Sequence, residues 1–364
     1  MAGVLQALLR PATVSQFVED FWPERPAVIP ASLERVRELF PLLASVPVRR
    51  LVEGYPQPVH AVGSNNTDGS QERMTDGRAA AAALDAGRTL CLAGVHMVSA
   101  EAHNAIANLT TELGLPMSAA QCNGYTSPPG EGVPWHFDDR EVIVVQLQGS
   151  KWWTVAVNRE VRYPTSNFVL ATRRPDEGDA MSSYSPREFA GPSLDDQHEL
   201  LLEPGSVIFL PRGTWHMTYA SEPSFSLSFG FFLPTALDVL LDAVRRRYVV
   251  DERYRRPLNH ASPAQREQAM AWLVELLRDW QQDMSRYDSR DLLQPGKVTP
   301  RQPSRTASKE TPMPAPAPEA AQTTPPEAAR AAAKKATMRT RATPPTASPA
   351  KKAATQRKPR RATE

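Results

Sequence analysis

The stretch Pro134-Trp135-His136-Phe137-Asp138, with the apolar run that follows it, decides the fold and the chemistry expected of this chain. The run Glu141-Val-Ile-Val-Val-Gln-Leu147 is rich in β-branched residues and is typical of a buried strand. Side chains two residues apart in an extended chain point to the same face. His136 and Asp138 are therefore expected to project side by side from the lip of that strand, an imidazole next to a carboxylate.

A second histidine stands in a similar setting much later in the chain. The segment Gly205-Ser-Val-Ile-Phe-Leu-Pro-Arg-Gly-Thr-Trp-His216 predicts a strand and a turn that end at His216. Two histidines and one carboxylate on a β scaffold form the facial triad that holds Fe(II) and leaves coordination positions open. The alternative is a surface histidine beside the solvated acidic pair Asp138 and Asp139. The two strand contexts together favour a metal site formed by His136, Asp138 and His216.

The spacing of apolar residues changes from helical to β near residue 118. Before this point it predicts strands at 27–30 and 89–95, a polar loop at 62–78, and helices at 13–21, 33–40 (ended by Pro41), 79–86 and 100–113. Beyond it, short strands are expected at 119–125, 141–148, 151–157, 200–203, 206–210 and 224–232. This order indicates a mainly β protein with flanking helices, built on a double-stranded β-helix of jelly-roll or cupin type.

We expect residues 1–235 to form this β domain and residues 236–296 to form a helical annex. Apolar residues recur at helical spacing in 236–247 and 263–284, so each of these helices has a face to bury. That face packs either on the barrel or on a second copy of the chain in a homodimer, and the sequence does not choose between them. The insert 159–198, rich in Arg, Asp, Pro and Ser, is expected to be a functional lid or a disordered loop.

Charge is segregated along the chain. Residues 297–364 hold 15 Lys and Arg against 4 Asp and Glu, whereas residues 1–296 hold 27 against 36. The tail also has 12 prolines and no aromatic, Ile or Leu residue, so it cannot bury enough apolar surface to fold and is predicted to be disordered. Its charge suits non-specific contact with the phosphates of RNA or DNA, without base stacking. A tail that only keeps the protein in solution is the alternative.

Several classes of protein are disfavoured by what the sequence lacks. Cys91 and Cys122 lie in different settings and predict reduced thiols, as in a cytoplasmic protein. The apolar run in residues 1–10 has no basic start and is too short to cross a bilayer, so neither an export signal nor a membrane span is expected. The sequence contains no Gly-rich phosphate loop, Cys-x-x-Cys pair or Gly-x-Ser-x-Gly elbow.

These motifs resemble those of the JmjC and cupin-type 2-oxoglutarate-dependent oxygenases. The resemblance lies in His136-Phe-Asp138, Gly149-Ser-Lys151 and Pro211-Arg-Gly-Thr-Trp-His216. Within that family the ribosomal-protein hydroxylases are the most similar subgroup, through Phe17-Val-Glu-Asp-Phe-Trp-Pro-Glu-Arg-Pro-Ala-Val-Ile29 and Ser127-Pro-Pro-Gly-Glu-Gly-Val-Pro-Trp-His136. The resemblance covers residues 13–235, and its motifs are more specific for the family than for any substrate.

The resemblance implies that His136, Asp138 and His216 hold Fe(II) and that 2-oxoglutarate chelates this iron. It also implies that Lys151, at the start of the next strand, binds the distal carboxylate of 2-oxoglutarate. A dicarboxylate that chelates iron at one end needs a fixed cation at the other. The alternative is a hairpin-edge lysine in water, which is the usual place for a lysine.

Further contacts to 2-oxoglutarate are expected from two strands. Ser127 matches a family position whose hydroxyl supports the same carboxylate, although a plain loop serine is the alternative. Asn123 and Tyr125 alternate with Ser127, so all three are expected on one face of their strand. Ser226 and Ser228 are expected either to line the barrel interior or to pack within it.

The resemblance therefore implies a protein hydroxylase that converts 2-oxoglutarate to succinate and carbon dioxide, with ribosomal proteins as expected substrates. Demethylation of a methylated lysine or arginine is a variant with the same co-substrate, and it stays open. A cupin metalloenzyme with other chemistry and a non-catalytic nucleic-acid adaptor are alternatives from other classes. Lys151 argues against the former, and a set of charged ligands inside a barrel argues against the latter.

Overall fold

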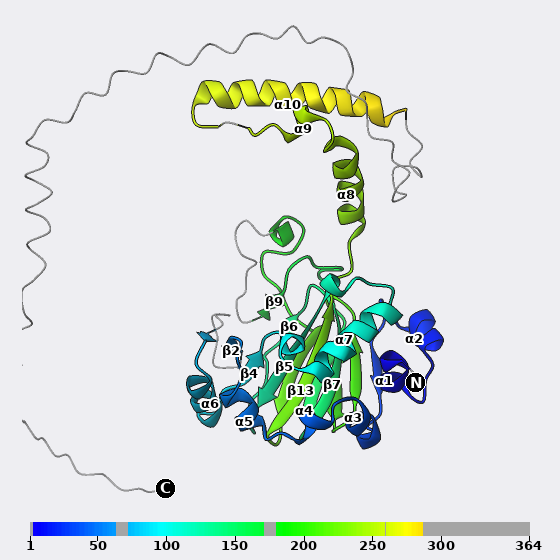
Figure 1. Cartoon of the computed structure of the whole chain (residues 1–364), viewed down its shortest axis with the longest axis vertical. Helices are drawn as coiled ribbons and strands as arrows, with labels where there is room; N and C mark the ends of the chain where they lie inside the picture. The colour runs from blue at the N-terminus through cyan, green and yellow to red at the C-terminus, as the bar shows by residue number, and fades with distance from the viewer. Residues whose placement is uncertain (1–2, 63–71, 171–179, 259, 287–364) are drawn as a thin grey trace, which may run out of the picture. The chain divides into compact units, whose positions relative to one another are not determined.

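The computed structural model describes residues 3–62, 72–170, 180–258 and 260–286 (Figure 1). The basic tail predicted at 297–364 lies wholly outside these residues, and so do parts of the 62–78 loop and of the 159–198 insert. Within the described ranges, the first 232 residues form two antiparallel β sheets, and helices pack against the larger one.

The strands pair in two sheets that confirm the predicted mainly β, jelly-roll fold. The larger sheet has the order β1 (Ala27–Ile29), β11 (Val207–Leu210), β7 (Glu141–Gln148), β13 (Ser224–Phe231), β5 (Ala120–Ser127), β4 (Leu90–Leu92), β2 (Val59–Ala61) and β3 (Glu72–Met74). The smaller sheet has the order β10 (His198–Leu202), β8 (Lys151–Ala156), β12 (Trp215–Ala220), β6 (His136–Phe137) and β9 (Phe168–Val169). Neighbouring strands run antiparallel in both sheets.

Seven α-helices precede the β core in the described part of the chain. They are α1 (Val4–Leu9), α2 (Val14–Asp20), α3 (Leu33–Leu39), α4 (Pro41–Ser45), α5 (Val48–Glu53), α6 (Gly77–Asp85) and α7 (Ala100–Glu112). The sequence did not predict α1 or α5. The predicted helix at 33–40 is confirmed as α3, which ends before Pro41, and a separate helix that was not predicted, α4, begins at Pro41. A proline fits there, since the first helical N–H has no partner within the helix to lose.

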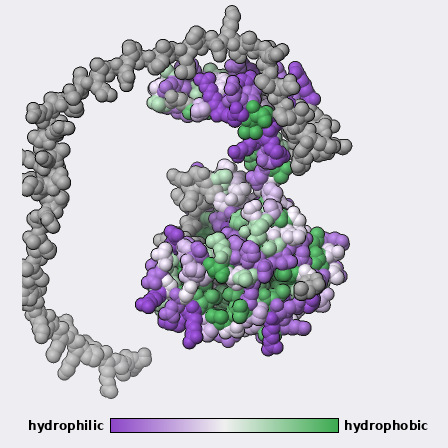
Figure 2. Space-filling view, viewed as in Figure 1, coloured by the Kyte–Doolittle hydropathy of each residue, from purple (hydrophilic) through white to green (hydrophobic). Residues whose placement is uncertain are grey.

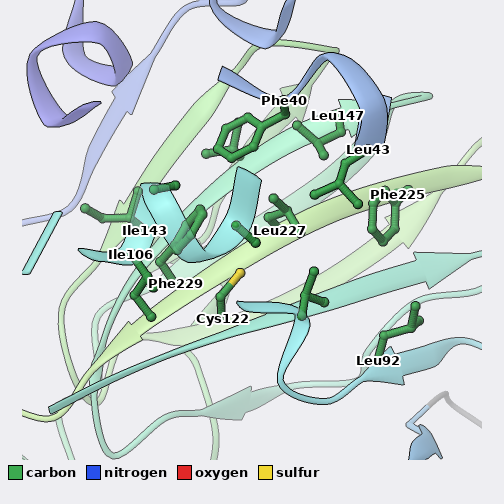
Figure 3. Packing of buried hydrophobic residues seen from close by; sticks show 14 of the residues in the cluster. Phe40, Leu43, Leu92, Ile106, Cys122, Ile143, Leu147, Phe225, Leu227 and Phe229 are labelled. Atoms are coloured by element: carbon green, nitrogen blue, oxygen red, sulfur yellow. The ribbon is translucent and has the colours of Figure 1, made fainter. Parts of the chain in front are cut away.

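Strict alternation along β13 divides its side chains between two environments. Phe225, Leu227 and Phe229 pack against the helices, together with Phe40 next to α4 and Ile106 of α7 (Figure 3). The serines between these residues face the other way, towards the smaller sheet. The same alternation in β7 sends Ile143, Val145 and Leu147 to the helices and Val142 and Val144 between the sheets. The period-two pattern therefore separates a helix-covered core from the interior of the barrel.

A tight turn between β7 and β8 fixes where β8 begins. Gly149 has φ +60° in this turn, and a side chain there would overlap the carbonyl oxygen of Pro223. Across the interior, Val142 and Val144 of β7 meet Trp153 and Val155 of β8. The turn thus places Lys151 as the first residue of β8, on the face that points inward.

The described part of the 159–198 insert is more ordered than predicted. Strand β9 pairs with β6, and Phe168 and Phe189 of the insert pack on Phe137 and Trp215 in a small apolar core. Of the two alternatives for the insert, the disordered loop is therefore wrong for residues 159–170 and 180–198, and the functional lid stays a prediction. The predicted 62–78 loop is also partly wrong, since β3 and the start of α6 lie within it.

The predicted helical annex contains α8 (Ala236–Tyr248), α9 (Glu252–Arg255) and α10 (Pro263–Met284). Asp283 of α10 links the helices, because it accepts hydrogen bonds from Arg247 Nε and Tyr248 Oη, each at 2.7 Å. Many apolar side chains of the annex stay on the surface, and Figure 2 shows such residues among hydrophilic ones over α8. Among the described helices, none is both long and apolar enough to cross a membrane.

Candidate metal centre and its pocket

Strand pairing brings the two predicted histidine ligands together. His136 of β6 lies directly opposite His216 of β12, and their ring centroids are 4.0 Å apart. Asp138 follows β6, and its Oδ2 is 3.9 Å from His216 Nε2. Ligand atoms of all three residues lie within 4.8 Å of one another, which is the geometry a single metal ion requires.

Backbone carbonyls orient both imidazoles in the same way. His136 Nδ1 lies 2.7 Å from the oxygen of Pro134, and His216 Nδ1 lies 2.9 Å from the oxygen of Thr214. A carbonyl only accepts, so each Nδ1 carries the proton and each Nε2 keeps its lone pair for a metal. The sequence places each carbonyl two residues before its histidine.

The turns that carry the ligands are tied to each other and to β7. The Gly213 amide donates to the carbonyl oxygen of Asp138 at 2.8 Å, which fixes the two ligand-bearing turns side by side. In the same turn Arg212 forms a buried ion pair with Glu141, with 3.2 Å between Nε and Oε1. Burial raises the pKa of the Glu141 carboxyl although Arg212 opposes the shift. Neither Arg212 nor Glu141 was singled out from the sequence.

His216 is prepared to bind a metal at neutral pH. Burial, and secondarily the neighbouring His136, lower the pKa of the His216 imidazole to about 4. The ring is therefore neutral at pH 7, and protons do not compete with a metal for Nε2. Trp153 stacks on this ring at 5.7 Å between centroids and 15° between planes, and holds its orientation.

Lys151 faces the same pocket as the three ligands and lacks a counter-charge. Its side chain is 2% exposed, and burial lowers the pKa of its amine to about 8. Within the described residues it has neither a hydrogen-bond acceptor nor an ion-pair partner. An unpaired buried cation is costly, so the pocket is built for an anion that completes it. We call this space the inner pocket; it is lined by Tyr125, Val133, His136, Asp138, Val142, Val144, Lys151, Trp153, Leu210, His216, Thr218, Ser226 and Ser228.

The other predicted contacts fall in two groups. Tyr125 and Ser228, with Ser226, line the inner pocket together with Lys151. Asn123 instead lines a larger cavity, and its Oδ1 accepts the Gly94 amide at 3.0 Å.

Ser127 is placed away from both spaces. Its hydroxyl accepts a hydrogen bond from Thr89 Oγ1 at 3.1 Å, and it is absent from the described lining of either cavity. Strand β4 pairs with this end of β5, which brings Thr89 next to Ser127. Tyr125 has a distinct environment, because the neighbouring Cys91 and burial hold the pKa of its phenol well above the usual value. The phenol is therefore a neutral hydrogen-bond donor at pH 7.

The larger cavity, which we call the wide cavity, encloses about 460 Å³ and opens beside the metal centre. It shares His136, Asp138, Tyr125 and Ser228 with the inner pocket, so the ligand set stands where the two spaces meet. Lys151 lines only the inner pocket, so a molecule in the wide cavity would approach the ligands without contacting it. The site therefore has space for two reactants, one in each cavity.

Four residues that line the two cavities were not predicted as site residues from the sequence. Thr218 and Trp153 line the inner pocket, and the indole N–H of Trp153 is buried without a partner in the described structure. Thr218 lies two residues after His216 on β12, a strand that was not predicted. Asn167 and Arg140 line the wide cavity, and Asn167 belongs to the insert that was expected to be loop.

Comparison with known proteins agrees with the motifs. The JmjC domain family matches residues 98–239, which contain the three metal ligands and Lys151. A protein of Bacillus subtilis strain 168, named "Uncharacterized protein YxbC", is 29% identical over 266 residues, which cover 71% of this chain and 80% of that protein.

Over shorter stretches, the chain is also similar to proteins named ribosomal oxygenases. Ribosomal oxygenase 1 of Homo sapiens is 32% identical over 111 residues, which are 30% of this chain and 15% of that protein. Ribosomal oxygenase 2 of Rattus norvegicus is 34% identical over 103 residues, or 28% of this chain and 18% of that protein. These matches span less than a fifth of either named relative. A solved structure of YcfD, a ribosomal oxygenase from Escherichia coli in complex with cobalt and 2-oxoglutarate, is 19% identical with a TM-score of 0.42, over 73% of this chain and 67% of that one. Residues 98–239 thus match the JmjC domain family that the motifs implied, and the proteins to which the chain is similar include ribosomal oxygenases.

Proposed function

We propose that this protein is an Fe(II)- and 2-oxoglutarate-dependent oxygenase that hydroxylates a side chain of another protein. The observation that carries the proposal is Lys151, a buried and unpartnered cation in the same pocket as a facial triad. A metal site alone fits many cupin chemistries. A fixed cation across the pocket from the metal adds the requirement for a second carboxylate on the co-substrate, which 2-oxoglutarate meets.

Several residues of the inner pocket would have specific roles in this reaction. His136, Asp138 and His216 would hold the iron, and Lys151 would bind the distal carboxylate of 2-oxoglutarate. Tyr125 stands beside the ligands as a neutral donor that can hydrogen-bond to the co-substrate. When bound, the iron and 2-oxoglutarate would supply the oxidising chemistry with O2 as the oxidant: one of its oxygen atoms would enter a substrate C–H bond, and the other would enter succinate as 2-oxoglutarate loses carbon dioxide. The apolar walls, including Val142 and Val144, exclude water from this reaction.

The lining of the wide cavity supports hydroxylation over demethylation. Among its described residues the metal ligand Asp138 is the only carboxylate, and the charge of Arg140 is paired with Asp139 at 2.8 Å. A methylated lysine or arginine is itself cationic, and the wide cavity would offer it no free carboxylate. We therefore assign the reaction as hydroxylation of a protein side chain.

Ribosomal proteins are the substrate class we propose, because named relatives are ribosomal oxygenases. The tail at 297–364 would hold the enzyme near RNA through phosphate contacts that weaken with salt. A cytoplasmic location is part of the same proposal and agrees with the two free, buried thiols, Cys91 and Cys122.

We also propose that the annex joins two copies of the chain. On α8, Leu237 and Leu241 are 62% and 57% exposed and lie one turn apart, so they form an unburied apolar stripe. The annex also surrounds an apolar cavity that includes Trp272 and Leu277. Apolar surface of this extent favours burial against a symmetric partner.

The oxygenase activity is tested with the full chain, Fe(II) and 2-oxoglutarate. Extracted ribosomal proteins supplied as substrate should gain one oxygen atom per modified residue, matched by succinate. His136→Ala should reduce both products to background, whereas His103→Ala, which changes an exposed histidine on α7, should leave them unchanged. Mass spectrometry of the proteins and of succinate checks this. Equal succinate from wild type and His136→Ala would refute the assigned metal site.

The role of Lys151 predicts a specific pH dependence. Only the protonated amine attracts the co-substrate, and its pKa of about 8 means that it is charged below this pH and neutral above it. The affinity for 2-oxoglutarate should therefore be level up to about pH 7 and fall by about tenfold by pH 9. Calorimetric titration of the Mn(II)-loaded protein under nitrogen measures this.

Two substitutions separate charge from shape in the same titration. Lys151→Met should weaken binding by about ten- to a hundredfold at pH 7, the usual value of a charged hydrogen bond. Lys151→Arg should bind with no decline at pH 9, because a guanidinium stays protonated. A decline above pH 8 that persists in Lys151→Arg would show that another group is responsible.

The annex proposal predicts a dimer in solution. Sedimentation of the full chain should give twice the chain mass, and Leu237→Glu with Leu241→Glu should give a monomer, because two charges would enter the buried contact. Leu194→Glu, at a leucine that is 84% exposed outside the annex, is the matched control and should leave the dimer intact. A wild-type chain that sediments as a monomer at micromolar concentration would contradict the proposal.

A further inference from the structure

The outer face of the smaller sheet carries a row of exposed apolar side chains. In the registers of β10, β8 and β12, Leu201 pairs with Trp152 and Trp152 pairs with Tyr219. Directly paired residues of an antiparallel ladder point to the same face, so the three side chains lie in a line across the strands. They are 41%, 42% and 49% exposed. We call this line the outer row.

The outer row lies on the opposite face of the sheet from the inner pocket. Lys151 and Trp153 flank Trp152 on β8, and both line the inner pocket. On β12, Thr218 precedes Tyr219 and also lines the inner pocket. Alternation therefore gives these strands one face for the metal centre and a second face with a separate use. A ligand on the outer row contacts none of the metal ligands.

Carboxylates border the outer row. Glu199 is on the same face of β10 as Leu201, two residues earlier, and Glu203 directly follows that strand. Glu222 stands at the end of β12, and its Oε1 accepts the Ser150 amide at 2.9 Å. All three side chains are exposed, and none has an ion-pair partner within the described structure.

Aromatic rings and unpaired carboxylates together select cations. The faces of Trp152 and Tyr219 attract lysine and arginine side chains, whose aliphatic stems also cover apolar surface. The bordering glutamates add ion pairs, each modest when exposed, and they repel phosphates. The net negative charge of residues 1–296 also attracts cations at longer range. It repels the phosphates of nucleic acid, so nucleic acid is disfavoured as a partner for this surface.

We propose that the outer row and its three glutamates form a docking surface for a Lys- and Arg-rich segment of a protein partner. The occupant is an extended segment, because the row crosses three strands in a line and is open at β10, the edge strand of the sheet. Such a contact goes beyond the proposed oxygenase reaction and does not depend on it. It would hold a basic protein on the enzyme by a surface that the reaction itself leaves free.

Binding of a labelled Lys/Arg-rich peptide to the full chain, without metal or 2-oxoglutarate, tests the proposal. Glu199→Lys with Glu203→Lys should weaken binding by about tenfold at low salt, because two attractions become repulsions. Glu19→Lys with Glu34→Lys changes the net charge equally at exposed glutamates of α2 and α3, and should weaken it by less than about twofold. Fluorescence anisotropy measures the affinities.

The aromatic part of the surface has its own variant. Tyr219→Leu keeps an apolar side chain but removes the ring, and should weaken peptide binding by about threefold or more. Unchanged melting temperature and unchanged 2-oxoglutarate binding in each variant show that the fold and the inner pocket are intact. Trp152 is left in place because it lies between Lys151 and Trp153.

Three results would overturn the docking surface. If both pairs of glutamate substitutions weakened peptide binding equally, the loss of affinity would come from the net charge and not from the outer row. A change of oligomeric state in Glu199→Lys with Glu203→Lys would assign the surface to a contact between copies. A carbodiimide crosslink from Glu199 or Glu203 to a lysine of the same chain, formed without peptide, would assign it to the protein itself.

Discussion

The pairing of His136 on β6 with His216 on β12 is the contact on which the rest of the site depends. It joins two turns that are far apart in sequence, and the hydrogen bond from the Gly213 amide to the Asp138 carbonyl holds the carboxylate ligand in the same place. The barrel is what makes this pairing possible, because β12 also pairs with β8 along its whole length. The scaffold therefore fixes the ligands before any metal arrives, which lowers the entropic cost of binding one.

A second constraint is electrostatic. A lysine buried beside a metal site destabilises the empty protein, since burial penalises its charge and no carboxylate among the described residues pairs with it. We propose that a ligand supplies the missing charge. A doubly charged co-substrate that bridges Lys151 and the metal would meet both requirements, and 2-oxoglutarate would then fit the inner pocket better than a neutral molecule. The wide cavity would then remain for the substrate.

Much of the fold could be predicted from the sequence because side chains alternate regularly between two environments along β13 and β7. The alternation in 225–231 and in 142–147 separates the side chains that face the helices from those that face the barrel interior. The triad was predicted from the segments 134–138 and 205–216. The strands that the sequence did not predict are β2 and β3, with three residues each, β6 and β9, with two residues each, and β12, whose polar residues hide its periodicity. Their pairing is set by the barrel and not by local preference. For the same reason, Ser127 has the right parity but is enclosed by Thr89, and the burial of Lys151 becomes visible only in three dimensions.

We propose that the triad and Lys151 form one site for one chelating dicarboxylate, so metal and 2-oxoglutarate must bind cooperatively. The most direct test is the affinity for 2-oxoglutarate under nitrogen, with and without saturating Mn(II), in wild type and in Asp138→Ala. We expect the metal to tighten binding by about tenfold or more, and Asp138→Ala to abolish this gain. Equal affinities with and without metal in the wild-type chain would contradict it, because the cation and the ligand set would then serve separate molecules.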